Sequence, residues 1–302
     1  PVYGNILYFN GNVSISSGET LTFACGYAQH GTASSSNYNI NPDVYVTAPA
    51  SAPFGVLNSG DNCKGITIKK LIGESGTGIV LGGRYKGDGA YTRNSYTNEV
   101  YKLSDISQYH GNITIMSGRS HLSRDTGNIR VAIAMSDTFG GSLEVEDGVD
   151  FQASGAKELA VSNLTLHAGS SYRVSYSTDT KTASVIRVSH AFAIPEDEGV
   201  VQVRFSALPA ARTDDRPLVL PLLVVPDTQE LDPSRFVCSA ADDLSFDDCP
   251  RFRVDEDKAA GTKTLVAVIL GKGHLVTSDS STYTGTGTDF SVLTPKTVSD
   301  KV

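Results

Sequence analysis

A short strand pattern recurs along this chain and constrains its fold more than any other feature. The pattern runs small residue, Asn, apolar, hydroxyl, apolar, two variable residues and Gly. Three segments carry it in full: Gly11–Gly18, Gly111–Gly118 and Ser162–Gly169. Weaker copies are Gly65–Ile68, Gly127–Val131 and Gly141–Gly148. Since strand side chains alternate between two faces, the apolar pair shares one face and the hydroxyl lies on the other. Asn and Gly are expected in left-handed or turn conformations at the corners.

The rest of the chain also predicts short strands. Apolar residues at helical spacing are interrupted by Gly, Pro or β-branched residues, so no long helix is expected. Gly, Asn, Asp, Ser or Pro bound the predicted strands, as in all-β chains. The predicted strands are Ile6–Phe9, Val13–Ser16, Leu21–Ala24, Asp43–Thr47, Gly65–Lys69, Gly78–Leu81, Glu99–Leu103, Asn112–Met116, Asn128–Ala134, Ser142–Glu146, Glu158–Val161, Leu164–His167, Tyr172–Tyr176, Ala183–Val188, Val200–Ser206, Pro217–Val225, Phe236–Cys238 and Thr264–Leu270.

The spacing of these strands favours an all-β solenoid. From residue 111 onward the patterned strands follow one another at roughly 15 to 20 residues, the scale of a solenoid coil. Stacked coils bury Val, Ile and Leu in a narrow core, while Ser and Thr remain exposed to solvent. We therefore predict a parallel β-helix with C-terminal capping strands. Tandem β-sandwiches are the alternative, because their strands also alternate and turn at short intervals.

Three regions are expected along the 302 residues. Residues 1–206 form the β-solenoid body. Residues 207–276 form a C-terminal cap or small β subdomain, because the apolar run Pro217–Pro226 contains three prolines, which suit an edge or capping strand. Residues 277–302 are rich in Ser, Thr and Gly and are predicted to be a flexible tail.

Charge excludes two classes of partner. Lys and Arg total 25 against 33 Asp and Glu, a formal net charge of -8. Binding to nucleic acid or to anionic membranes therefore lacks an electrostatic basis. No run of about 20 apolar residues occurs, so no membrane span is expected. The first residue is Pro1, and we expect a removed signal segment or a fragment.

The repeated strands carry a family resemblance. Asn112–Gly118, Ser142–Gly148 and Asn163–Gly169 resemble the right-handed parallel β-helix passenger domains of bacterial autotransporter-type surface proteins. The resemblance is good over residues 110 to 206, and over the rest of the chain it extends only to the general composition and rhythm of the sequence. It implies a protein that is secreted or displayed on the bacterial outer surface, with glycans or host cell surface proteins as partners. The resemblance does not rest on a catalytic motif. We expect no catalytic residue and no cofactor, with Ca²⁺ as the alternative, and the oligomeric state is open.

Four cysteines predict two disulfides. Cys25, Cys63, Cys238 and Cys249 fit neither a paired CxxC zinc site nor a redox motif. Among three connectivities we prefer Cys25 with Cys63 and Cys238 with Cys249, because short loops close at the least entropic cost. Disulfides would place folding in an oxidising compartment. Four buried thiols are the alternative.

Carboxylates provide one candidate for chemistry. Four of them cluster around one strand and its corner, Glu144, Glu146, Asp147 and Asp150, with Arg119, Arg124 and Arg130 before them. On a β-helix face, acidic residues holding Ca²⁺ with an Arg as base would suit a polysaccharide lyase. Glu144 and Glu146 share a face because strand side chains alternate. The competing interpretation is a solvated outer face.

Two further groups of polar residues were considered as ligands of a metal. The acidic loop between Cys238 and Cys249 could bind Ca²⁺, but it lacks the order of a calcium loop, and a solvated loop is favoured; its acids are Asp242, Asp243, Asp247 and Asp248, and the acidic stretch continues beyond it with Asp255, Glu256 and Asp257. The histidines have no metal-ligand spacing and are expected to be ordinary polar residues; they are His30, His110, His121, His167, His190 and His274.

A Gly-rich region with several tyrosines is the candidate for glycan contact. Its main residues are Arg84, Tyr85, Tyr91, Arg93 and Tyr96, and the group also includes Lys86, Asn94 and Tyr101. Tyr stacks on sugar rings and Arg donates to hydroxyls, and loops that leave a rigid scaffold often carry binding. We interpret the region as a long loop, with ordinary turn and rim packing as the alternative.

Three functions remain open at this point. A structural or adhesive β-solenoid module is favoured. A β-helix polysaccharide-active enzyme, either a lyase or a glycosidase, is the second hypothesis. A phage tailspike-like receptor-binding protein, which would normally form trimers, is the third.

Overall fold

The protein is built from β-strands. The computed structural model describes residues 13–15, 20–23, 36–58, 63–85, 91–93, 100–116, 129–134, 138–154, 158–177, 179–195, 197, 199–205, 218–238 and 250–269. Those residues form 23 strands and one short 3-10 helix, η1 (Pro233–Arg235). The predicted all-β class is confirmed. Among the described residues no helix is long and apolar enough to cross a membrane.

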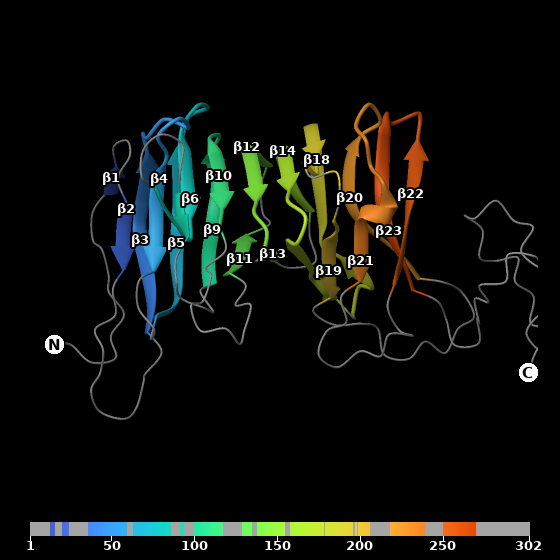
Figure 1. The fold of residues 1–302 in the computed structure, drawn as a ribbon, viewed down its shortest axis with the longest axis horizontal. Helices are drawn as coiled ribbons and strands as arrows, with labels where there is room; N and C mark the ends of the chain where they lie inside the picture. Colours follow the sequence, from blue (N-terminus) through green and yellow to red (C-terminus); the bar gives the residue numbers. More distant parts are fainter. Residues whose placement is uncertain are drawn as a thin grey trace, which may run out of the picture.

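Most strands belong to two large sheets (Figure 1). The nine-stranded sheet contains, in order, β1 (Val13–Ile15), β3 (Ser36–Val46), β5 (Cys63–Gly73), β9 (Val100–Tyr109), β11 (Ile129–Ala134), β13 (Val149–Ser154), β15 (Ser171–Val174), β19 (Val201–Phe205) and β21 (Phe236–Cys238). The ten-stranded sheet contains β2 (Thr20–Phe23), β4 (Phe54–Asn58), β6 (Gly78–Leu81), β10 (Asn112–Ile115), β12 (Thr138–Val145), β14 (Glu158–Leu166), β18 (Val185–Ala193), β20 (Leu218–Pro226), β23 (Thr262–Ile269) and β22 (Arg251–Asp257).

The chain passes back and forth between the two sheets. Strands β1 to β6 alternate between them, and so do β9 to β15 and β18 to β21. Within each sheet, neighbours up to β20 and β21 pair in parallel. Figure 1 shows the strands following one another along the longest axis in sequence order, except that β23 lies between β20 and β22. Two small antiparallel hairpins, β7 (Gly83–Tyr85) with β8 (Tyr91–Arg93) and β16 (Tyr176–Ser177) with β17 (Thr182–Ala183), interrupt the alternation.

The repeated sequence pattern falls on adjacent strands of the ten-stranded sheet. Its copies in β10, β12 and β14 lie side by side, with Asn112 paired to Ser142 and Ser142 to Asn163. The same position of each copy therefore occupies one row across the sheet. The copies at Val13, Ile66 and Ile129 belong instead to the nine-stranded sheet. The pattern predicted strands correctly, but it did not predict that its copies belong to two different sheets.

The prediction that Gly residues form the corners is confirmed, whereas the same prediction for Asn is wrong. Gly148 and Gly169 have φ of 72° and 86°, which glycine adopts without the steric cost that a Cβ brings. Among the described non-Gly residues only Lys181 has a positive φ. Asn112 and Asn163 lie inside strands, and the Asn163 side-chain amide donates to Ser142 Oγ at 3.0 Å. Asn163 therefore contributes a side-chain bond between strands, and neither Asn112 nor Asn163 has the left-handed conformation expected of a corner.

The apolar positions of the pattern make one continuous core. One row of inward residues joins Ile79, Ile113, Leu143 and Leu164, all of them buried. Aromatic rings stack along the same core, with 6.0 Å between the ring centroids of Phe151 and Tyr172. Burying each such side chain contributes about 1.5–3 kcal/mol. The core is therefore continuous along the stack of strands.

The last strands depart from parallel pairing. β20 pairs antiparallel with β23, and β23 pairs antiparallel with β22. The prolines of Pro217–Pro226 predicted an edge or capping strand, but β20 lies inside the sheet, between β18 and β23. Its ladder to β23 shifts register between Pro221 and Leu223. Proline is tolerated within a sheet at such an irregularity, which explains why the edge prediction was wrong.

Several strand predictions need correction. No strand was predicted at β4, β7, β8, β13 or β22, and the single strand β14 was predicted as two. β22 carries Asp255, Glu256 and Asp257, which had been predicted as the end of an acidic stretch between strands. This strand was missed because Phe252 and Val254 are its only apolar residues and it ends in three consecutive acids. Ile6–Phe9 and the predicted tail 277–302 lie outside the described residues.

Candidate functional site

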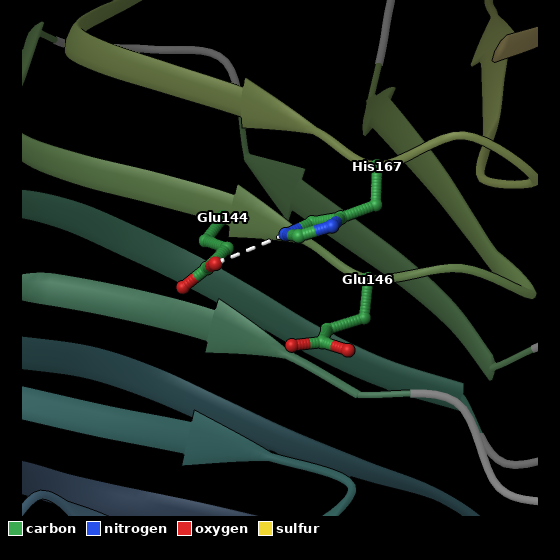
Figure 2. Close-up of side chains that lie close together, drawn as sticks. All are labelled: Glu144, Glu146 and His167. Carbon is green, nitrogen blue, oxygen red and sulfur yellow. Dashed lines mark hydrogen bonds and ion pairs between the residues drawn. The ribbon is translucent and has the colours of Figure 1, made fainter. Parts of the chain in front are cut away.

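Three side chains that can bind a metal converge where the ten-stranded sheet turns toward the nine-stranded one. They are Glu144, Glu146 and His167 (Figure 2). Glu144 lies in β12 between the buried Leu143 and Val145, so its carboxylate points to the outer face of the sheet. Glu146 follows β12 directly, and His167 follows β14. The strands β12 and β14 are neighbours, which brings the three side chains together.

Equivalent tight turns hold Glu146 and His167. Val149 N donates to Glu146 O at 3.3 Å, and Ser170 N donates to His167 O at 3.0 Å. Gly148 and Gly169 occupy the third position of these turns with positive φ, as a type II turn requires. The turns are also bonded to each other, since Gly148 N donates to Gly169 O at 3.1 Å. The backbone therefore fixes the relative placement of the two side chains.

The side-chain distances are short. His167 Nε2 lies 3.1 Å from Glu144 Oε1, and Thr114 Oγ1 donates to Glu144 Oε2 at 3.3 Å. One ligand atom from each of Glu144, Glu146 and His167 lies within 4.8 Å of the others. The side chains of His167 and Glu144 are 21% and 43% exposed, so solvent reaches the group. Two carboxylates and an imidazole in this arrangement can bind a divalent cation or share a proton.

The structure divides the predicted carboxylate cluster. Glu144 and Glu146 lie together, with Asp147 in the turn that Glu146 begins. Asp150 belongs to the other sheet, is 1% exposed, and accepts from Arg173 Nε at 3.1 Å and Nη2 at 2.7 Å. Grouping Asp150 with the other acids was therefore wrong, because the intervening corner moves it to the nine-stranded sheet.

The arginines of the lyase hypothesis are not brought to this site by any described contact. Arg130 pairs with Asp150 in the backbone register of β11 and β13. Its side chain, and the whole of Arg119 and Arg124, lie outside the described part of the chain. An arginine base beside Glu144 thus remains a prediction.

His167 was missed as a partner of the carboxylates. The spacing of the histidines along the chain gave no metal signal. The internal repeat contained one, because aligning Ser162–Gly169 with Gly141–Gly148 places His167 at the position of Glu146. Stacked repeats bring equivalent positions together, so this alignment predicts that His167 lies near Glu146, as it does in the structure.

The other described histidines have different surroundings. His190 Nδ1 lies 2.9 Å from Ser189 Oγ and 3.3 Å from Ser162 Oγ. His110 is exposed beside Gly140, where a Cβ would meet its Nδ1. Of the described histidines, only His167 belongs to a group of possible metal ligands. His30, His121 and His274 lie outside the described residues.

The candidate glycan-contact region contains a hairpin, which corrects the expected long loop. Arg84 and Tyr85 lie in β7, and Tyr91 and Arg93 lie in β8. The backbone register pairs Tyr85 with Tyr91 and places Arg84 opposite Thr92. Antiparallel pairing requires the chain to return on itself, and the Gly-rich segment between the strands permits this. Lys86, Asn94 and Tyr96 lie outside the described residues. Tyr101 lies in β9 and is 1% exposed, so including it among the sugar contacts was wrong because its ring belongs to the core.

The predicted disulfides stay predictions. Cys63 begins β5 and Cys238 ends β21. Their preferred partners, Cys25 and Cys249, lie outside the described residues.

The acidic stretch is only partly described. Asp255 Oδ1 lies 2.8 Å from Arg253 Nε, and Asp257 Oδ1 accepts from Ala259 N and Ala260 N at 3.0 Å. These two acids therefore have structural roles in and beside a strand. Asp242, Asp243, Asp247 and Asp248 fall outside the described residues, and a Ca²⁺ site there remains untested.

Comparison with known proteins adds no family. No protein-family model matches the chain, and no curated protein matches it. The resemblance to autotransporter passengers therefore rests on the repeated sequence pattern alone.

Proposed function

We propose that this chain is a secreted or surface-displayed β-solenoid module with a structural or adhesive role. Its body would be a parallel β-helix, and the antiparallel strands after β20 would be its C-terminal cap. One observation carries the proposal: the repeat positions Asn112, Ser142 and Asn163 pair in register on three successive parallel strands. Sequence repeats that stack row on row are typical of solenoids.

The strand pairing supports this architecture over tandem β-sandwiches. Sandwich strands pair mainly antiparallel through hairpins and Greek keys. Here β3 pairs with β5 and β4 with β6, each in parallel with the strand two places further along the chain. Such pairing needs a crossover through the opposite sheet between partners. A β-helix provides that crossover once per coil.

The adhesive role rests on the surface that such a stack offers. Polar side chains such as Thr114, Glu144 and Thr165 occupy one outward row of the ten-stranded sheet. The hairpin β7–β8 brings Tyr85 opposite Tyr91, and both are suited to contact with sugar rings. We propose glycans or host cell surface proteins as the partners, with the hairpin as the first contact.

Binding to a glycan array tests the adhesive role. The full chain is compared with a Tyr85→Ala/Tyr91→Ala variant, and a Tyr45→Ala variant serves as the control because Tyr45 is an exposed tyrosine on β3, in the nine-stranded sheet and outside the hairpin. We expect the double variant to lose at least about tenfold in affinity, given that truncation of aromatic anchors costs most at interfaces. Equal binding by all three proteins, or binding to no glycan and no host surface protein, would contradict the adhesive proposal.

One observation favours an enzyme as the second candidate. Glu144 and Glu146 lie close together near the outer surface, as a pair of catalytic carboxylates requires. Incubation with pectin, alginate and glycosaminoglycans tests this candidate. A reducing or unsaturated product that disappears in Glu144→Gln would support the enzyme, and the absence of product from each polysaccharide would exclude it for those substrates.

A further inference from the structure

We propose that Glu144, Glu146 and His167 form a binding site for a zinc-class divalent transition metal. The site does not depend on the adhesive role of the module. It requires only that the turns after β12 and β14 stack as they do in Figure 2.

The distances between the donor atoms suit a single ion. Protein ligands lie about 2.0–2.2 Å from Zn²⁺, so two ligands of one ion lie roughly 3.0–3.5 Å apart at tetrahedral or octahedral angles. The 3.1 Å between His167 Nε2 and Glu144 Oε1 falls in that range. The chosen donor atoms of all three residues lie within 4.8 Å of one another. A small rotation of the Glu146 side chain completes the set.

Thr114 provides the support that a metal ligand needs from its surroundings. Its hydroxyl donates to Glu144 Oε2, which leaves Oε1 directed at His167. A ligating carboxylate is usually oriented by such a bond to its second oxygen. Thr114 lies in β10, one strand away on the side opposite His167, so three successive strands contribute to the arrangement.

The donor chemistry selects the class of metal. Ca²⁺ and Mg²⁺ prefer sites made entirely of oxygen ligands. An imidazole with two carboxylates suits Zn²⁺ and its first-row neighbours. Two carboxylates beside one histidine also give the site a net negative charge that a divalent cation compensates. The structure thus favours zinc over the calcium considered from sequence.

A metal here would tie two successive coils together. Glu146 begins the turn from β12 to β13, and His167 begins the turn from β14 to β15. A ligand that binds only the folded chain raises its unfolding temperature by mass action. Zn²⁺ binding should therefore be visible both as heat of binding and as a shift in thermal unfolding.

Calorimetric titration of the tag-free full chain with ZnCl₂ tests the proposal, at a pH above about 7 where an ordinary imidazole is neutral. We expect His167→Ala and Glu146→Gln each to weaken binding by at least about tenfold, the lower bound that even supporting residues show. Zn²⁺ should raise the unfolding temperature of the native chain and shift that of His167→Ala much less. Any affinity for CaCl₂ should be the same in the native chain and in His167→Ala, because Ca²⁺ prefers oxygen ligands to imidazole.

Two matched variants control for loss of any surface histidine or acid. His190 and Glu158 lie on the same sheet, and Glu158 pairs with Arg187 at 2.9 Å. His190→Ala and Glu158→Gln should retain native Zn²⁺ affinity, which also separates this site from any other metal-binding group in the chain. Equal Zn²⁺ affinity in the native chain and folded His167→Ala, or no binding at millimolar Zn²⁺, would overturn the proposal. In either case the contact between Glu144 and His167 is an ion pair alone.

Discussion

Two regions of the ten-stranded sheet differ in how neighbouring strands pair. The parallel region contains β10, β12 and β14, and the antiparallel region contains β20, β23 and β22. In the parallel region, a residue contacts its equivalent in the next repeat, as Asn163 contacts Ser142. In the antiparallel region, β22 and β23 are consecutive and pair through a short turn between Asp257 and Thr262. The parallel region can continue strand after strand, whereas the antiparallel hairpin returns on itself and ends the sheet.

The two regions also differ in where their charges lie. In the parallel region, Asp150 is almost completely buried and accepts two bonds from Arg173. In the antiparallel region, Arg253 and Asp255 form a pair on the edge strand β22, with the Asp255 side chain 46% exposed. Charges along an edge strand discourage further strand addition. The buried pair instead demands precise stacking of β13 on β15, because a misplaced charge there has no water to solvate it.

Breaking the two ion pairs should give the largest difference between the regions. Arg173→Ala leaves the Asp150 carboxylate buried without its bidentate partner and should cost about 3–5 kcal/mol. Arg253→Ala removes an exposed pair and should cost at most about 1 kcal/mol. Chemical denaturation measures both.

The buried charge itself is tested by adding Asp150→Asn to Arg173→Ala. Neutralising residue 150 should recover part of the lost stability. Equal costs for Arg173→Ala and Arg253→Ala, or no recovery in the double variant, would contradict this account of the buried pair.

Truncating the core tests the continuity of the stacked rows. Leu143 is buried between Ile113 and Leu164 on the adjacent strands, so Leu143→Ala should cost about 2–5 kcal/mol in a denaturation experiment. Val219 in β20 is 40% exposed, and Val219→Ala should change stability by about 0.5 kcal/mol or less. If Leu143→Ala were as mild as Val219→Ala, the row of core residues would not be packed as described.

Close approach of neighbouring strands gives a smaller effect. A Cβ added at Gly141 would meet the carbonyl of Gly111 in the preceding repeat, so Gly141→Ala should cost about 1–3 kcal/mol through backbone displacement. Gly76 has open space around it but a φ of 86°, and Gly76→Ala should cost about 1 kcal/mol from conformation alone. Thermal unfolding compares them, and a neutral Gly141→Ala would be inconsistent with the stacking of Gly141 on Gly111.

Acid titration should give the smallest effect. Hydrogen bonds from the Ser107 hydroxyl and backbone lower the pKa of Asp105 in β9, and the corresponding bonds from Ser234 lower the pKa of Asp232 before η1. A lowered folded-state pKa stabilises the fold above the unfolded pKa of about 3.9, and this stabilisation disappears as pH falls through the folded pKa.

Replacing one of these acids tests that pH dependence. Asp232→Ala should lose at most about 1 kcal/mol at neutral pH and should approach the native chain in stability below pH 3.9. A constant difference in unfolding free energy across that range would show that the carboxylate charge plays no part.

Sequence reasoning predicted the local structure better than the arrangement of strands. The pattern around Asn112 and Asn163 predicted strands and Gly-containing corners because both depend on neighbouring residues. It could not assign strands to one sheet or the other, since each sheet buries the same kind of apolar pair. β22 escaped detection because an edge strand needs little apolar surface.

Only the carboxylates of the candidate site were predicted, because their proximity depends on neighbouring residues. Glu144 and Glu146 share a face by strand alternation alone, so a single segment predicts their proximity. His167 joins them only through the register between β12 and β14, which depends on stacking of distant residues. The mistaken inclusion of Asp150 arose because its segment turns a corner at Gly148.

Oxidative crosslinking of introduced cysteine pairs tests the central claim most directly. Asn112, Ser142 and Asn163 lie in one row on adjacent parallel strands, about 4.8 Å apart from strand to strand. Because the Cα atoms of a disulfide lie about 4.4–6.8 Å apart, Asn112→Cys/Ser142→Cys and Ser142→Cys/Asn163→Cys should each form a disulfide in the folded chain. Failure of both pairs to crosslink would contradict the parallel register.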